Sequence, residues 1–173
     1  NSPSRSVHVI LESLHACGCQ VPRVEDNTSV RHDRTVASRF VVRTRATAAA
    51  EDLFDVSLDI DAHVASMEHS GERAIDGVVS GRIDLGQEVT WQARHFGIWF
   101  TMTSRITALH RPTRFVDEQV RGPFRSFRHE HRFDAVAGVT TMTDTIDLSS
   151  PVFGILAERV VLVPYLRRLS RLR

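Results

Sequence analysis

Hydrophobic and polar residues alternate along most of the chain after residue 37, and this pattern predicts β-strands. Residues 39–45 (Arg-Phe-Val-Val-Arg-Thr-Arg) are rich in the β-branched and aromatic side chains that strands favour. Turn residues then separate six further strands, expected at about 72–84, 88–97, 99–109, 113–121, 125–134 and 139–148. Consecutive strands joined in this way form an antiparallel meander.

Three helices are expected around this sheet. The first begins after Thr47, which is placed to cap it, with Glu51 near the capping-box position. The second spans about Asp59 to Met67. The third runs from about Phe153 to Leu172, has apolar residues at spacings of three and four, and contains Pro164, which is expected to kink it. The order β, α, α, six β, α predicts an α+β fold, with a bent antiparallel sheet wrapped around the long C-terminal helix and a cavity between them.

Residues 1–37 differ in amino-acid composition from the rest of the chain. Ser, Pro, Asn, Asp and Arg cluster there around one short helical pattern at 7–14. We expect an appendage that is partly disordered or forms a short helix, followed by one ligand-binding domain over residues 38–173. His15, Cys17 and Cys19 lie in the appendage, but a structural zinc site needs four ligands and no second cluster lies near them. The sequence therefore predicts no metal site in this segment.

The amino-acid composition argues against several classes of function. All 22 basic residues are arginine, which excludes chemistry that needs a lysine amine, such as a Schiff base, pyridoxal phosphate attachment or a P-loop. The net charge of +1 gives no large field to recruit nucleic acid or anionic lipid. Two cysteines and short apolar runs are not typical of a disulfide scaffold, a signal peptide or a membrane span. We expect a cytoplasmic protein with no cofactor and no nucleic-acid partner.

Several segments resemble one superfamily. They are residues 71–81 (Gly-Glu-Arg-Ala-Ile-Asp-Gly-Val-Val-Ser-Gly), 89–97 (Val-Thr-Trp-Gln-Ala-Arg-His-Phe-Gly), 115–119 (Phe-Val-Asp-Glu-Gln), 122–124 (Gly-Pro-Phe) and 129–131 (His-Glu-His). Together they are similar to the START-like helix-grip superfamily, and within it to the bacterial proteins grouped with polyketide cyclases and dehydrases (the SRPBCC group). The resemblance covers about residues 38–173. It implies a helix-grip fold with a hydrophobic ligand cavity, and it leaves the function open because the superfamily includes carriers, receptors and enzymes. Two features depart from the family pattern: residues 1–37 lie outside the resemblance, and Pro164 interrupts the final helix.

The most distinctive polar residues alternate along one predicted strand. Phe127, His129, His131 and Phe133 share one face, because side chains of a strand alternate between its two faces. If Ala135 to Gly138 forms the following loop, Asp134 pairs with Val139, His131 lies opposite Met142 and His129 lies opposite Asp144. The apolar row that contains Asp144, with Ile146 and Leu148, is expected to face inward. A buried carboxylate beside a histidine is therefore predicted.

Three interpretations of this cluster remain open. His129, His131 and Asp144 can satisfy one another as a polar patch in the cavity wall. Alternatively, Asp144 fixes the tautomer of His129, whose other ring nitrogen then binds a ligand or acts as an acid or base. The third interpretation is a metal site in which the two histidines are joined by Asp144 or His95. The facing of residues 115–120, which include Phe115, Asp117 and Gln119 on one side, is undetermined.

We expect the chain to bind or carry a hydrophobic small molecule such as a lipid, an isoprenoid or a polyketide-like compound. Alternation places Val89, Trp91, Ala93 and His95 in one apolar row and Phe100, Met102, Ser104 and Ile106 in the next. The expected ligand-binding residues are Trp91, His95, Phe100, Met102, Phe127, His129, His131, Met142 and Leu166. One alternative is a cyclase or dehydratase that uses His129 and Asp144 as an acid–base pair. Another is a protein-interaction module with a collapsed cavity and an unknown partner.

Overall fold

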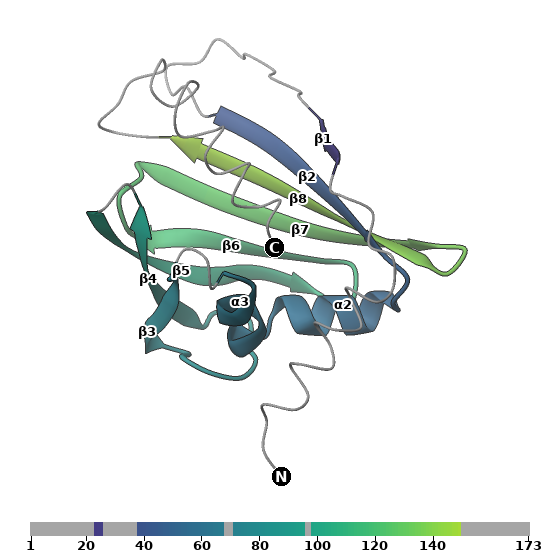
Figure 1. The fold of residues 1–173 in the computed structure, drawn as a ribbon, viewed down its shortest axis with the longest axis horizontal. Helices are drawn as coiled ribbons and strands as arrows, with labels where there is room; N and C mark the ends of the chain where they lie inside the picture. The colour runs from purple at the N-terminus through teal and green to yellow at the C-terminus, as the bar shows by residue number, and fades with distance from the viewer. Residues whose placement is uncertain (1–22, 26–37, 68–70, 96–97, 150–173) are drawn as a thin grey trace.

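The computed structural model describes residues 23–25, 38–67, 71–95 and 98–149. Its elements are β1 (Arg23–Glu25), β2 (Ser38–Ala46), α2 (Ala50–Ser57), α3 (Ile60–Ser66), β3 (Arg73–Gly77), β4 (Glu88–His95), β5 (Ile98–His110), β6 (Arg114–Arg121), β7 (Ser126–Val136) and β8 (Val139–Ser149). The strands form one eight-stranded antiparallel sheet in the order β1-β2-β8-β7-β6-β5-β4-β3. The sheet is strongly bent, and α2 and α3 lie against it at one end (Figure 1).

The predicted order of one strand, two helices and six strands is confirmed over residues 38–149. Strand β1 was not predicted; it adds to the sheet edge by pairing with β2. The expected helices at 7–14 and 153–172, and with them His15, Cys17, Cys19, Pro164 and Leu166, lie outside the described residues. The described part of the chain contains no helix that is both long and apolar enough to cross a membrane.

The start of α2 differs from the prediction. Its N-cap is Ala49 and makes no side-chain capping hydrogen bond, so the expected cap at Thr47 is wrong. The chain needs residues 47–49 to turn away from β2, and the Thr140 hydroxyl anchors that turn by donating to the Ala48 carbonyl at 2.5 Å. Helix α3 lies within its expected range, and Asp59 caps its start by accepting from the Ala62 amide at 2.8 Å.

The core beneath the helices is built around Phe54 of α2, which is fully buried. Its ring makes edge-on contacts with Phe115 and Phe133, at centroid distances of 5.5 and 5.3 Å. Leu53 and Ile60 join the same cluster. Helix α2 therefore fixes the inner face of β6 and β7, the two strands that also carry the polar residues described below.

Strand β3 is shorter than predicted and ends at Gly77. Gly77 has φ of +74°, and the Glu88 carbonyl lies where a Cβ would stand, so the chain turns there instead of continuing as a strand. The following loop is tied to the helices by two backbone hydrogen bonds, from Ile60 to Gly81 at 2.8 Å and from Ile83 to Leu58 at 3.0 Å.

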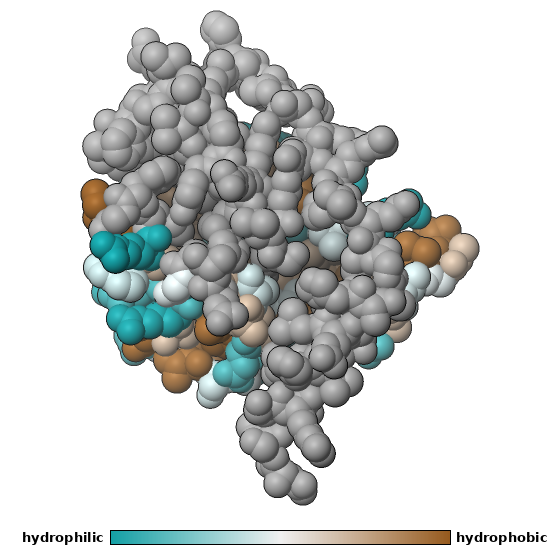
Figure 2. Space-filling view, in the orientation of Figure 1, coloured by the Kyte–Doolittle hydropathy of each residue, from teal (hydrophilic) through white to brown (hydrophobic). Residues whose placement is uncertain are grey.

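The hairpin between β7 and β8 is tighter than expected. Its loop is the two-residue turn Ala137–Gly138, with φ of +51° and +78°, and Val136 pairs with Val139. The predicted pairing of Asp134 with Val139 is therefore wrong by two residues. An even shift keeps every side chain on its predicted face but changes the cross-strand neighbours. The tip of this hairpin is hydrophobic on its surface (Figure 2), where Val136 is 74% exposed.

The register shift changes the neighbours of both histidines. His131 lies opposite Asp144 and His129 lies opposite Ile146, so the expected pairs His131 with Met142 and His129 with Asp144 are not formed. Met142 instead pairs with Phe133. The faces were predicted correctly, since Asp144, Ile146 and Leu148 are buried.

Candidate functional site

The inner face of β4 and β5 is an apolar wall. Val89 pairs with Ser104, Trp91 with Met102 and Ala93 with Phe100, so the two predicted rows face the same side. Val89, Ala93, Ser104 and Ile106 are buried, whereas Trp91, Phe100 and Met102 are half-buried. His95 ends β4, and its side chain lies outside what the structure describes.

A second part of the inner face, on β6, β7 and β8, is polar. Asp117 comes from β6, His129 and His131 from β7, and Asp144 from β8. The register sets Asp117 opposite His129 and His131 opposite Asp144, so four adjacent positions bring two carboxylates and two imidazoles together. The exposed fraction of the side chain is 18% for Asp117, 13% for His129, 4% for His131 and 7% for Asp144.

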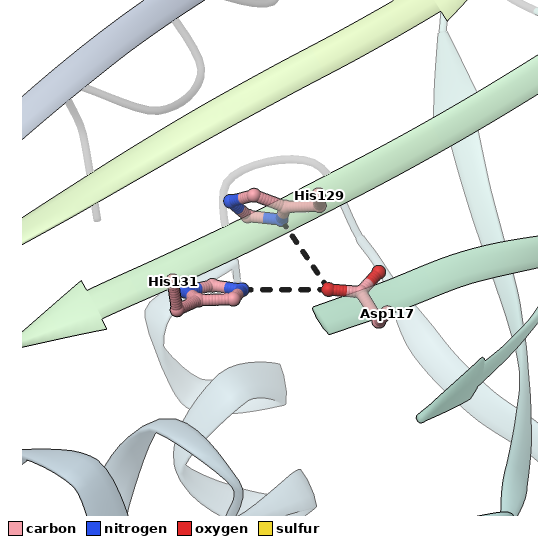
Figure 3. Close-up of side chains that lie close together, drawn as sticks. All are labelled: Asp117, His129 and His131. Carbon is pink, nitrogen blue, oxygen red and sulfur yellow. Dashed lines mark ion pairs between the residues drawn. The ribbon is translucent and has the colours of Figure 1, made fainter. Parts of the chain in front are cut away.

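The two carboxylates lie on opposite sides of the two imidazoles. Asp117 Oδ1 is 3.4 Å from His131 Nε2 and 3.6 Å from His129 Nδ1 (Figure 3). Asp144 Oδ1 is 2.7 Å from His131 Nδ1 and 3.5 Å from His129 Nε2. Each ring therefore presents one nitrogen to Asp117 and the other to Asp144. We call these four residues the inner polar cluster.

Aromatic rings pack around the inner polar cluster. The His131 ring stacks on Phe115, with a centroid distance of 4.0 Å and an interplanar angle of 17°. The His129 ring lies 3.8 Å from that of His131, and Phe127 approaches it edge-on at 6.4 Å. Phe127 itself packs against the buried cluster around Phe40. The imidazoles are thus held in fixed orientations by ring contacts as well as by the carboxylates.

The charges in the cluster are strongly coupled. Burial lowers the pKa of His129 and the nearby positive charge of His131 lowers it further, so His129 is favoured in its neutral form. Burial opposes the charged form of His131 too, but the negative charge of Asp144 and the contacts with Asp117 outweigh it and raise the pKa of His131.

Both carboxylates are held ionised. Burial raises the pKa of Asp117, but its contact with His131 lowers it more. Burial also raises the pKa of Asp144, and the opposing effect of His131 dominates, so the net pKa is well below its ordinary value. The cluster thus has two carboxylates that favour the ionised form and one imidazole, that of His131, that favours the charged form. The negative charges outnumber the positive one.

Some atoms of the cluster are not satisfied by aligned hydrogen bonds. His129 Nε2, His131 Nδ1 and Asp144 Oδ1 are buried and make no hydrogen bond of good geometry. His131 Nδ1 and Asp144 Oδ1 are only 2.7 Å apart, but the contact is poorly directed. It is therefore an ion pair without the geometry of a hydrogen bond. Unsatisfied buried polar atoms are rare in folded proteins, and a functional role or a bound water or ion is among the explanations for them.

A smaller polar pair borders the apolar wall. His63 of α3 contacts Glu72 through Nε2 and Oε1 at 2.6 Å, and the His63 ring lies 4.4 Å from that of Trp91. Both side chains are mostly buried, at 21% and 13% exposure. No specific partner was predicted for Glu72, because its contact with His63 depends on how α3 packs against the start of β3.

The structure brings together three of the predicted polar residues, His129, His131 and Asp144. It adds Asp117, which lies on the strand whose facing was undetermined. The local signal for Asp117 was ambiguous, since Phe115 is apolar and shares its face but Val116 and Val120 are apolar on the other face. Trp91, Phe100 and Met102 lie on strands β4 and β5, and Met142 packs against the core near Ser57, with Oγ and Sδ at 3.6 Å.

Comparison with known proteins supports the fold. No protein-family model matches the sequence, and neither does any curated protein. Solved structures do match. The protein TTHA0849 of Thermus thermophilus is 14% identical with a TM-score of 0.63, over 78% of this chain and 91% of that one. The major latex-like protein 151 of Panax ginseng is 15% identical with a TM-score of 0.55, over 79% and 94%. CalU16 of Micromonospora echinospora is 15% identical with a TM-score of 0.52, over 79% and 78%.

At this level of identity the likeness concerns the fold. The likeness extends over more than nine-tenths of the Panax ginseng and Thermus thermophilus structures. Over the described part of residues 38–173, the chain has the bent antiparallel sheet and the two helices of the START-like helix-grip fold that the sequence resembles.

Proposed function

Starting from the helix-grip fold, we propose that this chain binds a hydrophobic small molecule against the inner face of its sheet, on the apolar wall of β4 and β5. The observation that supports the proposal is the contrast within that wall. Val89, Ala93 and Ile106 are fully packed, whereas Trp91 and Met102, which lie side by side in the register, remain half-buried. An aromatic and a flexible thioether side chain that are only half-buried among packed neighbours suit a hydrophobic ligand.

The ligand classes that fit are those with a large apolar body, such as a lipid, an isoprenoid or a polyketide-like compound. The inner polar cluster lies on the neighbouring strands of the same sheet and offers imidazole and carboxylate groups. A hydroxyl or carbonyl at one end of the ligand would find its hydrogen-bond partners there. Burial of about 300 Å² of apolar ligand surface at about 25 cal/mol per Å² provides about 7 kcal/mol before association entropy is subtracted. Micromolar affinity corresponds to about 8 kcal/mol, so it requires a larger buried area or polar contacts in addition.

The two tryptophans of the chain give a matched test. Trp91 lies on the apolar wall, and Trp99 is 53% exposed, with the Arg73 guanidinium 5.5 Å from its ring. In a titration with the fluorescent probe anilinonaphthalene sulfonate, we expect Trp91→Ala to raise the dissociation constant at least about tenfold, because a large apolar contact is lost. Trp99→Ala should change it less than about twofold. Equal effects of the two changes, or no saturable binding by the wild type, would reject the proposal.

A second candidate function is a cyclase or dehydratase reaction in which His129 acts as acid or base with Asp144. It is favoured by the position of His129, which is more exposed than His131 and has its two ring nitrogens 3.5 and 3.6 Å from carboxylate oxygens. A compound released from the purified protein would be incubated with it and followed by mass spectrometry. Turnover that is lost in His129→Ala with the fold intact would support catalysis, and unchanged turnover in that variant would exclude this role.

A further inference from the structure

The inner polar cluster has the donor set of a metal site. Among the described residues, Asp117, His129 and His131 form a group whose ligand atoms all lie within 4.8 Å of one another. Two imidazole nitrogens and one carboxylate oxygen are ligands that suit divalent first-row transition metals. The sequence alone did not predict this set, because it offered Asp144 or His95 as the third ligand and left the facing of Asp117 undetermined.

The distances fit a metal better than they fit hydrogen bonds. Asp117 Oδ1 lies 3.4 Å from His131 Nε2 and 3.6 Å from His129 Nδ1. Both separations exceed the 2.7 to 2.9 Å of a charge-assisted hydrogen bond. Ligands at about 2.0 to 2.1 Å from a tetrahedral zinc ion are about 3.3 to 3.4 Å from one another. The two separations from Asp117 Oδ1 are therefore close to those between ligands of one zinc ion, and all three ligand atoms lie within 4.8 Å of one another (Figure 3).

Asp144 occupies the position that supports such a site. Its Oδ1 faces the nitrogen of each ring that points away from Asp117, at 2.7 Å for His131 and 3.5 Å for His129. A carboxylate at the far nitrogen of a metal-binding histidine fixes the tautomer and raises the basicity of the ligating nitrogen. The same arrangement leaves His131 Nε2 and His129 Nδ1 directed at Asp117, where the ion would sit (Figure 3).

Charge and burial agree with this assignment. Two carboxylates face two imidazoles in a region where all four side chains are at least four-fifths buried. The three buried atoms of the cluster without aligned hydrogen bonds, His129 Nε2, His131 Nδ1 and Asp144 Oδ1, all lie on the Asp144 side of the rings, so they are not the proposed ligand atoms. A divalent cation between Asp117 and the two rings would replace the long contacts of 3.4 and 3.6 Å by directed bonds.

We propose that Asp117, His129 and His131 bind a divalent transition-metal ion of the zinc type, with Asp144 orienting the two imidazoles. Three protein ligands leave a coordination position for a polar atom of a bound molecule. The proposal goes beyond hydrophobic ligand binding, which does not require it. If His129 binds a metal through a ring nitrogen, that nitrogen cannot also act as the acid or base of the second candidate function. The two roles of His129 therefore exclude each other at that atom.

The test uses the full chain, freed of metal with a chelator and titrated with zinc chloride by calorimetry and with cobalt(II) chloride by visible absorption. We expect one ion per chain and the intense d–d absorption of tetrahedral cobalt. Asp117→Asn should weaken zinc binding at least about 100-fold, and Asp144→Asn about 10- to 100-fold, as changes to orienting carboxylates do. The double variant Cys17→Ser, Cys19→Ser removes the thiols outside the proposed site and should bind as tightly as the wild type.

A second measurement on the wild type covers the case in which Asp117→Asn does not fold. Nitrogen-15 spectra of the histidine rings should show zinc-dependent shifts at His129 Nδ1 and His131 Nε2, and His110, which is exposed on β5, should not respond. Three results would overturn the proposal: no stoichiometric binding by the wild type, binding that survives Asp117→Asn unchanged, or binding that is lost in the double cysteine variant. Unperturbed rings of His129 and His131 at saturating zinc would have the same consequence.

Discussion

The buried ion pair between Asp144 and His131 predicts a large and specific loss of stability on Asp144→Asn. Asparagine keeps the shape of the side chain and one acceptor oxygen but removes the negative charge. At an effective dielectric constant of about 20, unit charges 2.7 Å apart attract by about 6 kcal/mol, and burial of the two groups offsets part of this. Removal of one partner of a buried pair typically costs about 3 to 5 kcal/mol. Because Asp117 still faces His131 at 3.4 Å, we expect about 3 kcal/mol.

The assay is equilibrium unfolding in urea at neutral pH, with chelator present so that no metal contributes. With a slope of about 2 kcal/mol per molar urea, the expected change moves the midpoint down by about 1.5 M. Asp147→Asn is the matched control, because Asp147 lies on the same strand with its side chain paired to Arg39 on the other face. Arg39 is 57% exposed there, so the control should cost no more than about 1 kcal/mol.

Equal losses in the two variants would refute the reasoning. They would mean that His131 is not held as a cation by Asp144, and that the cluster is neutral or solvated instead of charged and buried.

Three further predictions concern the fold that positions the site, and thermal or urea unfolding checks each. Ala137→Asn should raise the unfolding free energy by about 0.5 to 1 kcal/mol, because asparagine tolerates the φ of +51° in the hairpin turn better than alanine does. Gly77→Ala should lower it by at least about 2 kcal/mol, since φ is +74° and the new Cβ would meet the Glu88 carbonyl; no loss would show that the turn can relax. Burial opposes ionisation of Glu130, but its arginine partners lower its pKa to about 2. Because this pKa lies below that of an unfolded glutamate, its stabilising effect exists above about pH 4.5 and fades toward pH 2. Glu130→Gln should therefore cost about 1 to 2 kcal/mol at pH 7, and a cost that persists unchanged in acid would contradict this explanation.

The sequence was sufficient for the element order and for most side-chain faces, because both depend on local periodicity. Strands β4 to β8 lie within a few residues of their expected bounds. The inward facing of Asp144 followed from its apolar neighbours on the strand, and its burial confirms it. A period of two is robust to errors in loop length as long as the error is an even number of residues.

Pairing partners could not be predicted in the same way. The β7–β8 loop was expected to contain four residues, because alanine at position 137 gives no signal for the positive φ that a two-residue turn requires. The resulting shift by two residues moved Asp144 from His129 to His131. A local conformation that the residue type disfavours thus decided which histidine received the carboxylate.

Asp117 was missed for a different reason. Its strand is joined to β7 by residues 122–125, and the Gly122-Pro123 turn there was compatible with either facing of the strand. The structure resolves the choice through packing at a distance, since Phe115 fits edge-on against Phe54 of α2 and stacks on His131. Contacts between residues far apart in the chain are not encoded in any local pattern, so only the folded arrangement could bring the third ligand atom to the histidines.

The separation of the apolar wall from the inner polar cluster makes the two proposals independent. Trp91 and Met102 lie on β4 and β5, whereas the cluster is carried by β6, β7 and β8. Loss of probe binding in Trp91→Ala should therefore leave zinc affinity within about twofold of the wild type, because Trp91 is on a different strand from the three proposed ligands and changes at separate sites are nearly additive. If a molecule that carries a polar group reaches both regions, zinc should tighten its binding and the molecule should tighten zinc binding by the same factor. Unequal factors in the two directions would show that one of the two binding measurements reports a different site.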